Sequence, residues 1–315
     1  MAAPYLKSEL SSHPAECARA QLLARCFWGL VGATTVLIVL GAMVRANGAG
    51  LACPDWPLCF GEVIPEFDMK VGFEWGHRAL AGSVGLIFLA LGAWVLRQPG
   101  MRRPLLPWLS VAAVLLATQV VLGALTVWEL LASWTVSSHL VVGNAVNAGF
   151  ATIAWRLGKL ERGDSGPTIP TGIRWLVGGA AMLLLFQLIL GGQVSSRFAG
   201  LACDEWPACH AGVWFPDFNG ARGLHLLHRI TGYALVAALV AAALATRALG
   251  RVGRRLRAAA VVGIAQAIVG IANVLLRIPI EVTGAHSLLA ALLVLLTTLA
   301  VCETFHRRDR SGVAL

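Results

Sequence analysis

The stretch AGLACPDWPLC, residues 49–59, returns as AGLACDEWPAC at residues 199–209. Both stretches place two cysteines around a Trp-Pro pair, and both follow a long apolar run. An internal repeat of this kind indicates that one structural unit occurs twice along the chain. The sequence around the two stretches shows what that unit is.

The composition predicts a membrane protein. Hydrophobic residues make up 57% of the chain and charged residues 13%, against about 25% charged residues in soluble domains. Backbone inside lipid must satisfy its own hydrogen bonds, so long apolar runs predict helices rather than irregular segments. We therefore expect an all-α fold with eight transmembrane helices, from runs of about 20 residues at 24–46, 75–97, 106–128, 134–157, 174–194, 224–247, 256–277 and 282–304.

The repeat extends over whole helices. LGAMVRANGAGLACPDWPLC aligns with LGGQVSSRFAGLACDEWPAC, and ATQVVLGALTV at 117 aligns with IAQAIVGIANV at 264. Each repeat has four spans, so the halves share one orientation and are expected to be related by a pseudo-two-fold axis along the membrane normal. This predicts two tandem four-helix bundles, with the chain divided into an N-terminal segment 1–23, a first half 24–157, a linker 158–173, a second half 174–304 and a tail 305–315.

Basic residues predict the orientation. With both termini in the cytoplasm, 18 of the 25 Lys and Arg residues flank the cytoplasmic ends of the spans, as the positive-inside rule requires. The net charge of +9 is then a topology signal, and no basic soluble domain is present to bind nucleic acid. The first 23 residues lack a signal-peptide core, so we expect a multi-pass protein of the bacterial inner membrane.

This orientation places both cysteine loops outside, where disulfides persist. We expect local disulfides between Cys53 and Cys59 and between Cys203 and Cys209, although four cysteines allow three connectivities. A redox-active or zinc-binding role is the alternative, but the spacing is not that of a zinc site and CDEWPACH lacks the C-x-x-C-H gap of covalent haem attachment. The remaining cysteines are expected to be thiols: Cys17, Cys26 and Cys302.

Four histidines share one expected depth near the outer face, each in the first turns of an even-numbered helix: His77, His139, His228 and His286. A single membrane histidine is often an interhelical hydrogen-bonding group. Two matched pairs favour axial haem ligands, because bundles hold haem between histidines on facing helices. We therefore expect one porphyrin in each half, near glycines that would equally suit ordinary helix packing: Gly82, Gly85, Gly123, Gly143, Gly232 and Gly270.

Three arginines lie near the same interface. Arg78 and Arg229 each follow a candidate ligand, and Arg45 ends the first span. A guanidinium there could pair with haem propionates, and snorkelling to lipid headgroups is the alternative. Gln119 and Gln266 recur at matched positions, where an interhelical hydrogen bond is expected.

Taken together, the outer loop GLACPDWPLC, EWGHR at 74–78 and a histidine in every even helix resemble the heme A synthase family over residues 24–304. The resemblance implies an oxidoreductase that converts a methyl group of heme O into the formyl group of heme A by successive hydroxylations. It implies haem b in the second half, held by His228 and His286, and substrate heme O in the first half, held by His77 and His139. It also implies supply by heme O synthase and use in assembly of a haem-copper terminal oxidase.

Glu74 is the expected catalytic residue under this resemblance. It stands three residues before His77 and therefore on the same helical face, whereas the aligned position of the second half carries His225. The carboxylate could stabilise charge developing at the oxidised methyl carbon or take up its protons. An ion pair with Arg78 is the alternative.

Two other functions use the same features. A di-haem electron carrier would normally place haems near opposite faces, and a quinone-linked disulfide oxidoreductase would leave the four histidines unexplained. Besides the lipid bilayer, the expected partners are an electron acceptor of unidentified type and a second copy of the chain in a homo-oligomer.

Overall fold

The computed structural model describes residues 14–66, 68–162 and 168–306, and in this part of the chain all regular elements are helices. Eight are α-helices and one is a short 3-10 helix, so the predicted all-α class is confirmed for the described residues. The predicted segment 1–23 and tail 305–315 lie mostly outside them, as do 163–167 of the predicted linker.

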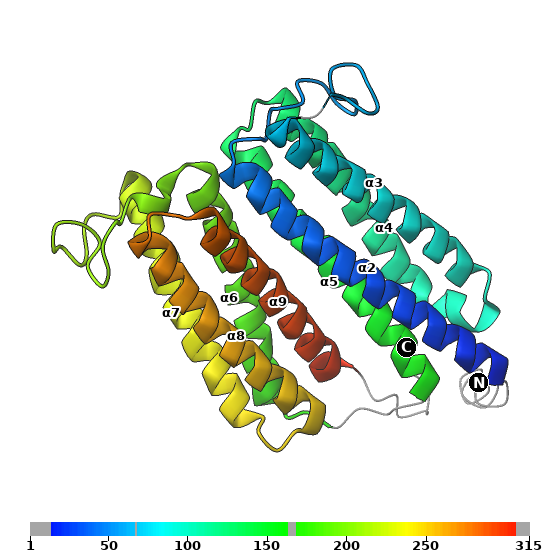
Figure 1. Ribbon diagram of the computed structural model, residues 1–315. Coiled ribbons are helices and arrows are strands. Elements are labelled where there is room, and N and C mark those ends of the chain that lie inside the picture. Colours follow the sequence, from blue (N-terminus) through cyan, green and yellow to red (C-terminus); the bar gives the residue numbers. More distant parts are fainter. Residues whose placement is uncertain (1–13, 67, 163–167, 307–315) are drawn as a thin grey trace.

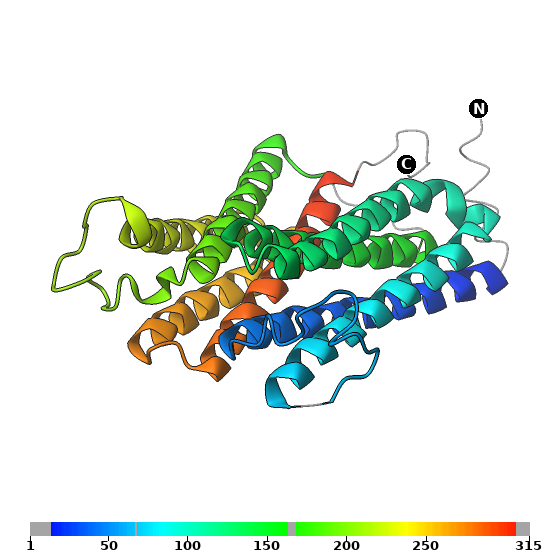
Figure 2. The same ribbon diagram turned by 90° about the horizontal axis from the view of Figure 1, so that it is seen from above.

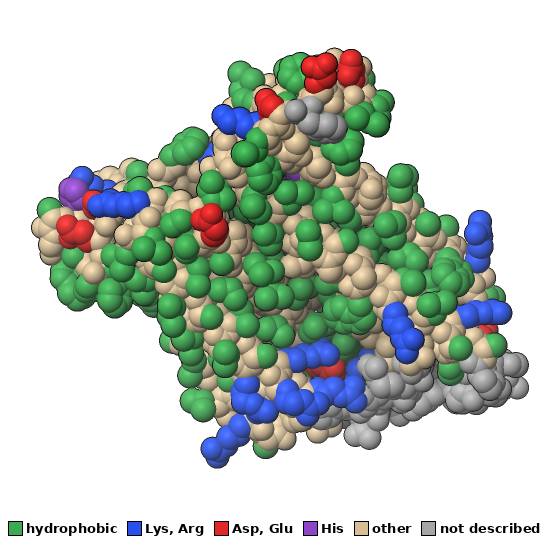
Figure 3. Space-filling view, in the orientation of Figure 1, with side chains coloured by type: hydrophobic (Ala, Val, Ile, Leu, Met, Phe, Trp, Pro, Cys, Tyr) green, Lys and Arg blue, Asp and Glu red, His purple; other side chains and the backbone are tan. Residues whose placement is uncertain are grey.

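The helices are long and lie side by side, with the two cysteine loops at one end of the molecule (Figure 1). We call this the loop end, and the opposite end the basic end, because Lys and Arg side chains gather there (Figure 3). The helices are α2 Pro14–Ala46, α3 Met69–Leu96, α4 Pro99–Trp128, α5 Ser133–Arg162, α6 Thr171–Ser196, α7 Gly220–Ala245, α8 Gly250–Leu275 and α9 Ile280–Phe305, with the 3-10 helix at Ala199–Leu201.

Local sequence explains where α3 and α4 begin. Asp68 is the N-cap of α3, and its Oδ1 accepts the Val71 N–H at 2.8 Å, which satisfies one free amide of the first turn. Pro99 begins α4, where a missing N–H costs nothing. The predicted linker 158–173 is shorter than expected, because α5 continues to Arg162 through good helix formers such as Lys159 and Leu160.

Helices α2–α5 lie on one side of the molecule and α6–α9 on the other (Figures 1 and 2). Within the first group, α2 contacts α3 and α5, and α4 contacts α3 and α5; within the second, α6 contacts α7 and α9, and α8 contacts α7 and α9. Between the groups, α5 contacts α6 and α9, and α2 contacts α9. Helices α5 and α9 are therefore central.

Among the described residues, seven helices are long and apolar enough to cross a membrane, and α5 is the exception. Helix α5 covers the predicted span 134–157 with 30 residues, enough for a bilayer. It carries polar residues such as Asn144 and Asn147, both buried, and Trp134 is its one exposed side chain over 133–160. Neighbouring helices shield α5 from lipid, so it does not need an apolar surface. The chain is a multi-pass membrane protein.

Core packing of the first group of helices depends on aromatic contacts. Phe150 of α5 is fully buried, and its ring centre lies 5.0 Å from that of Phe88 on α3. Replacing Phe150 with Ala is expected to lower the free energy of unfolding by about 3–5 kcal/mol, because a large cavity remains. Thermal unfolding in detergent measures the effect. Val114→Ala, at a side chain 67% exposed, is the control, and equal midpoints for both variants would contradict this account of the core.

Candidate functional site

Each cysteine loop is closed by a disulfide. Cys53 is bonded to Cys59 and Cys203 to Cys209, and all four side chains are buried. Cys17, Cys26 and Cys302 are not part of a disulfide.

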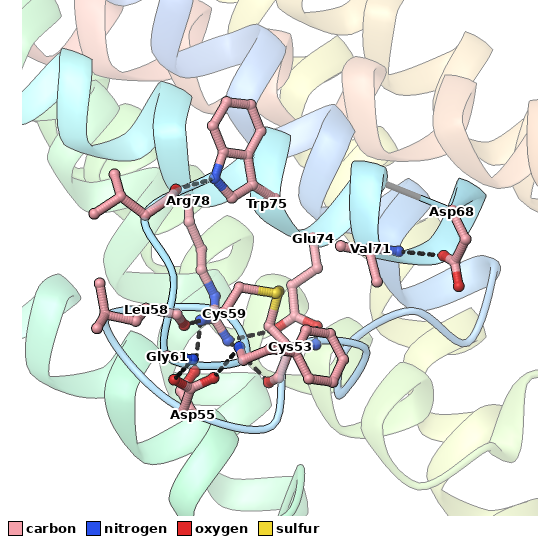
Figure 4. Close-up of a disulfide and its surroundings, with 12 residues drawn as sticks. Cys53, Asp55, Leu58, Cys59, Gly61, Asp68, Val71, Glu74, Trp75 and Arg78 are labelled. Carbon is pink, nitrogen blue, oxygen red and sulfur yellow. Dashed lines mark hydrogen bonds and ion pairs between the residues drawn. A yellow bond between two sulfur atoms is a disulfide. The ribbon is translucent and has the colours of Figure 1, made fainter. Parts of the chain in front are cut away.

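Arg78 holds the first loop on helix α3 (Figure 4). Its Nη1 donates to the carbonyl oxygens of Asp55 and Leu58, both at 2.6 Å, and its Nη2 donates to the Cys53 carbonyl at 3.2 Å. Nη2 also forms an ion pair with Glu74 Oε1 at 2.6 Å. The ion pair named above as the alternative role of Glu74 is therefore present.

Glu74 is buried and both of its oxygens are held. Oε2 accepts the Cys53 N–H at 2.9 Å, while Oε1 faces Arg78. A carboxylate bound in this way has a fixed position one helical turn from His77. It connects the disulfide loop to the helix that carries the histidine.

The second loop is held by the same scheme with different chemistry. Arg229 donates to the carbonyl oxygens of Cys203, Glu205 and Ala208 at 2.7, 2.8 and 3.1 Å. His225 Nδ1 accepts the Cys203 N–H at 3.2 Å, so an imidazole occupies the place that the Glu74 carboxylate has in the first loop.

Asp55 stabilises the turn that ends the first loop. Its two oxygens accept the N–H groups of Phe60 and Gly61 at 2.7 and 2.8 Å. The Gly61 N–H chiefly holds the pKa of Asp55 below its usual value. Because the folded-state pKa is lowered, this contribution to stability is present above the unfolded pKa of about 3.9 and is lost as pH falls through the folded value.

In the second loop, the acidic side chains near the corresponding turn make different contacts. Glu205, which aligns with Asp55, accepts the Gly212 N–H at 3.0 Å. Asp204 Oδ1 lies 2.8 Å from His210 Nδ1, and this hydrogen bond chiefly lowers the pKa of Asp204.

The four predicted histidines all lie near the loop end of their helices. His77 and His228 are eight residues from the start of α3 and α7, and His139 and His286 are six residues from the start of α5 and α9. The ring centres of His77 and His139 are 6.4 Å apart. The structure thus brings the first pair together between α3 and α5.

Each histidine ring lies against a glycine of a neighbouring helix. A Cβ added to that glycine would meet the ring Cε1 at 3.0–3.3 Å, closer than ordinary packing allows. The four pairs are Gly41 with His77, Gly123 with His139, Gly191 with His228 and Gly270 with His286. Each glycine stands five residues before the end of its helix.

Sequence reasoning found two of these glycines and missed the other two. Gly123 and Gly270 were among the candidates, whereas Gly82 and Gly85 have no such neighbour. Gly41 and Gly191 were not identified, although the aligned repeat LGAMV and LGGQV contains them at one position.

Glutamine side chains contact two of the four rings. Gln119 Nε2 lies 3.2 Å from His139 Nε2, and Gln187 Nε2 lies 3.0 Å from His228 Nδ1. Gln266, expected to make a similar bond, has a buried Oε1 without a partner. Gln187 was missed because Leu37 stands at the aligned position of the first half.

Arg45 contacts the other half of the chain. Its Nη2 donates to the carbonyl oxygens of Ser195 and Ser196 at 3.1 and 3.2 Å, and its guanidinium lies 4.3 Å from the ring centre of Phe198. A cation at the carboxyl end of α6 also complements the helix dipole.

The paired histidines fit a haem better than a bare metal ion. No group of three or more His, Cys, Asp or Glu side chains suited to a metal occurs among the described residues. Haem brings four nitrogen ligands of its own and needs at most two from the protein. Metal–imidazole bonds of about 2 Å would separate two ring centres by roughly 6 Å, close to the observed spacing of His77 and His139. The Nδ1 atoms of His77, His139 and His286 are buried without a hydrogen-bond partner.

Comparison with known families agrees with this chemistry. The sequence model of the cytochrome oxidase assembly protein family, COX15-CtaA, matches residues 24–298. The chain belongs to this family.

Relatives in the family carry the name heme A synthase. The protein of Shewanella oneidensis is 28% identical, over 83% of this chain and 90% of the relative. The protein of Erythrobacter litoralis is 28% identical, over 88% of this chain and 96% of the relative. The protein of Shouchella clausii is 32% identical, over 64% of this chain and 69% of the relative.

The loop contacts of this COX15-CtaA protein predict the effect of removing Arg78. Arg78→Gln loses the hydrogen bonds to three loop carbonyls, so backbone amides of residues 53–61 are expected to exchange with deuterium about tenfold faster or more. Hydrogen exchange with mass spectrometry measures this. Lys70→Gln, which removes an exposed cation from the same helix, is the control, and unchanged exchange in Arg78→Gln would show that the loop is held by other means.

Proposed function

We propose that the protein is a heme A synthase, which oxidises a methyl group of heme O to the formyl group of heme A for a haem-copper terminal oxidase. The supporting observation is the pair of histidines in each half of a COX15-CtaA chain, with every ring against a glycine. Heme O synthase as supplier and the oxidase assembly machinery as recipient follow from this proposal.

The proposed architecture is two tandem four-helix bundles related by a pseudo-two-fold axis along the membrane normal. Matched glycine and histidine positions in both groups of helices support it, and so do the equivalent loop contacts of Arg78 and Arg229. We place the loop end outside and the basic end in the cytoplasm of a bacterial cell, with both termini cytoplasmic, because Lys and Arg concentrate at the basic end (Figure 3).

The two halves are proposed to hold different haems. His77 and His139 would bind substrate heme O, and His228 and His286 would bind a resident haem b. A haem held by two imidazoles supplies an iron that can exchange electrons. The two sites differ in which histidine a glutamine contacts, because Gln119 lies against His139 and Gln187 against His228.

Glu74 distinguishes the first half chemically. The scaffold is repeated, yet this position is a carboxylate in one half and His225 in the other, and both accept the N–H of the first loop cysteine. Arg78 and the Cys53 amide fix the carboxylate in place before substrate arrives. We propose that Glu74 then stabilises positive charge at the reacting methyl carbon or takes up its proton, as preorganised charges do.

The arginines have an established structural task and a proposed one. Arg78 and Arg229 donate to loop carbonyls, and pairing with haem propionates stays a prediction for both. Their place at the loop end, next to the histidines, supports that prediction.

The two other functions have weaker support. All four histidines lie near the loop end, whereas a carrier of electrons across the membrane needs sites near both faces. A disulfide oxidoreductase needs an accessible sulfur, whereas the cysteines of both disulfides are at most 1% exposed.

The haem b assignment predicts a spectroscopic change. His228→Ala or His286→Ala is expected to abolish or shift the sharp absorption bands of a haem that co-purifies with the protein, because one axial ligand is lost. Optical spectra of the reduced protein measure this. His210→Ala, at an exposed loop histidine, is the control, and unchanged spectra in both ligand variants would refute the assignment.

The role of Glu74 predicts a selective loss of activity. Glu74→Gln keeps the size of the side chain but removes its charge and replaces one accepting oxygen with an NH2 donor. Heme A formation is therefore expected to slow by about 10²–10⁴-fold while heme O accumulates. The haem b spectrum is expected to stay unchanged. Chromatography of extracted haems measures the ratio, with Glu62→Gln as the exposed control. Wild-type rates in Glu74→Gln, together with loss of oxidation in His225→Ala that retains haem b, would move the active site to the second half.

A further inference from the structure

A cavity of about 530 Å³ lies between the two groups of helices. Its walls come from α5, α6 and α9, with Trp108 of α4. It begins at Val141, two residues after His139, and extends along α5 to Arg156 near the basic end. Most of its length is apolar, with walls that include Ala145, Ala148, Leu184, Leu188 and Val294.

Arg156 gives this apolar cavity a charged end. Among the described residues its guanidinium has no carboxylate within ion-pair distance, and its contacts are the faces of Trp108 at 4.1 Å and Trp155 at 6.0 Å. Its Nε is buried without a hydrogen-bond partner. A buried donor without an acceptor is costly, so the site suits a ligand that supplies one.

Glu303, which follows the wall residue Cys302, is already paired with basic side chains. Glu303 is 2% exposed, lies 3.4 Å from both Lys159 and Arg255, and accepts the Trp155 indole N–H at 2.9 Å. Glu303 is therefore not paired with Arg156. The uncompensated charge of Arg156 favours an anion.

We propose that this cavity binds an acidic phospholipid, with the phosphate at Arg156 and one acyl chain along α5 and α6. A guanidinium matches phosphate geometry, and basic pockets between helices at a cytoplasmic face are suited to anionic lipid headgroups. The apolar walls supply the chain site, and exposed Leu185 places one wall at the outer surface, where bilayer lipid would contact it. This binding does not depend on the proposed enzymatic function.

A prenylated quinone is the competing occupant. Asn144 and Thr297 line the cavity deeper than Arg156, and each has a buried oxygen without a partner. The Thr297 hydroxyl could donate to a quinone carbonyl, whereas Asn144 Oδ1 can only accept. A quinone would also leave the charge of Arg156 uncompensated. The charge therefore favours the phospholipid.

Native mass spectrometry of the full-length delipidated protein tests the proposal with phosphatidylglycerol, phosphatidylcholine and a short-chain prenyl quinone as probes. The wild type is expected to retain phosphatidylglycerol in preference to phosphatidylcholine. Arg156→Gln is expected to weaken phosphatidylglycerol binding about tenfold or more, as loss of a charged hydrogen bond does. Arg254→Gln, which removes an exposed cation from the same end, is expected to bind as the wild type does.

A second variant tests the chain site separately. Ala181→Leu places a larger side chain in the cavity wall and is expected to weaken phosphatidylglycerol binding while Arg156 stays in place. Glycerol phosphate, which lacks an acyl chain, is expected not to compete with phosphatidylglycerol. Equal binding by wild type and Arg156→Gln, an equal loss in Arg254→Gln, or full competition by glycerol phosphate would each overturn the proposal. Quinone binding that is tighter than lipid binding and indifferent to Arg156 would overturn it too. If Arg156→Gln does not fold, unchanged binding in Ala181→Leu is decisive against it.

Discussion

Close contact between an imidazole ring and a glycine recurs four times in this protein, and the helix arrangement depends on it. At each site a methyl group in place of the glycine hydrogen would lie about 3 Å from the ring. The backbone of one helix must therefore pass directly beside the histidine of the next. Because each glycine lies five residues before its helix ends and each histidine lies in the first turns of its helix, these contacts gather at the loop end and set the level at which a flat cofactor could bind.

The two disulfide loops are attached to the same helices that carry His77 and His228. Arg78 and Arg229 tie a disulfide loop to the helix that carries a histidine, so the loop cannot move without shifting that helix. An arginine holds each loop, but the group that accepts the first cysteine N–H is a carboxylate in one and an imidazole in the other. Equivalent contacts are thus made by side chains of different chemistry.

Much of this could be predicted from the sequence, because the signals were local or repeated. Apolar length predicts the helices, and the repeat predicts which histidines are equivalent. Helix α5 shows where hydropathy fails to identify a membrane-spanning helix. Its polar residues are buried against other helices, so its composition does not show that it lies within the bundle. Gly41 was missed because a close approach between helices depends on packing that one helix alone does not reveal. The carbonyl contacts of Arg78 were missed for a related reason, since backbone acceptors in an irregular loop leave no pattern in the side chains.

The contact between the two groups of helices differs from end to end. At the loop end it is polar and close: Ser137 and Ser196 hydroxyls lie 3.0 Å apart, and Arg45 of α2 reaches the last carbonyls of α6. Toward the basic end α5 and α9 stay in contact through Glu303, which accepts the Trp155 N–H at 2.9 Å and lies 3.4 Å from Lys159. The cavity that ends at Arg156 lies beside this contact. Protein interiors rarely leave such volume empty, and a bilayer offers hydrocarbon chains to fill it. A lipid chain in this position would fill the space beside the protein contacts that already join α5 and α9.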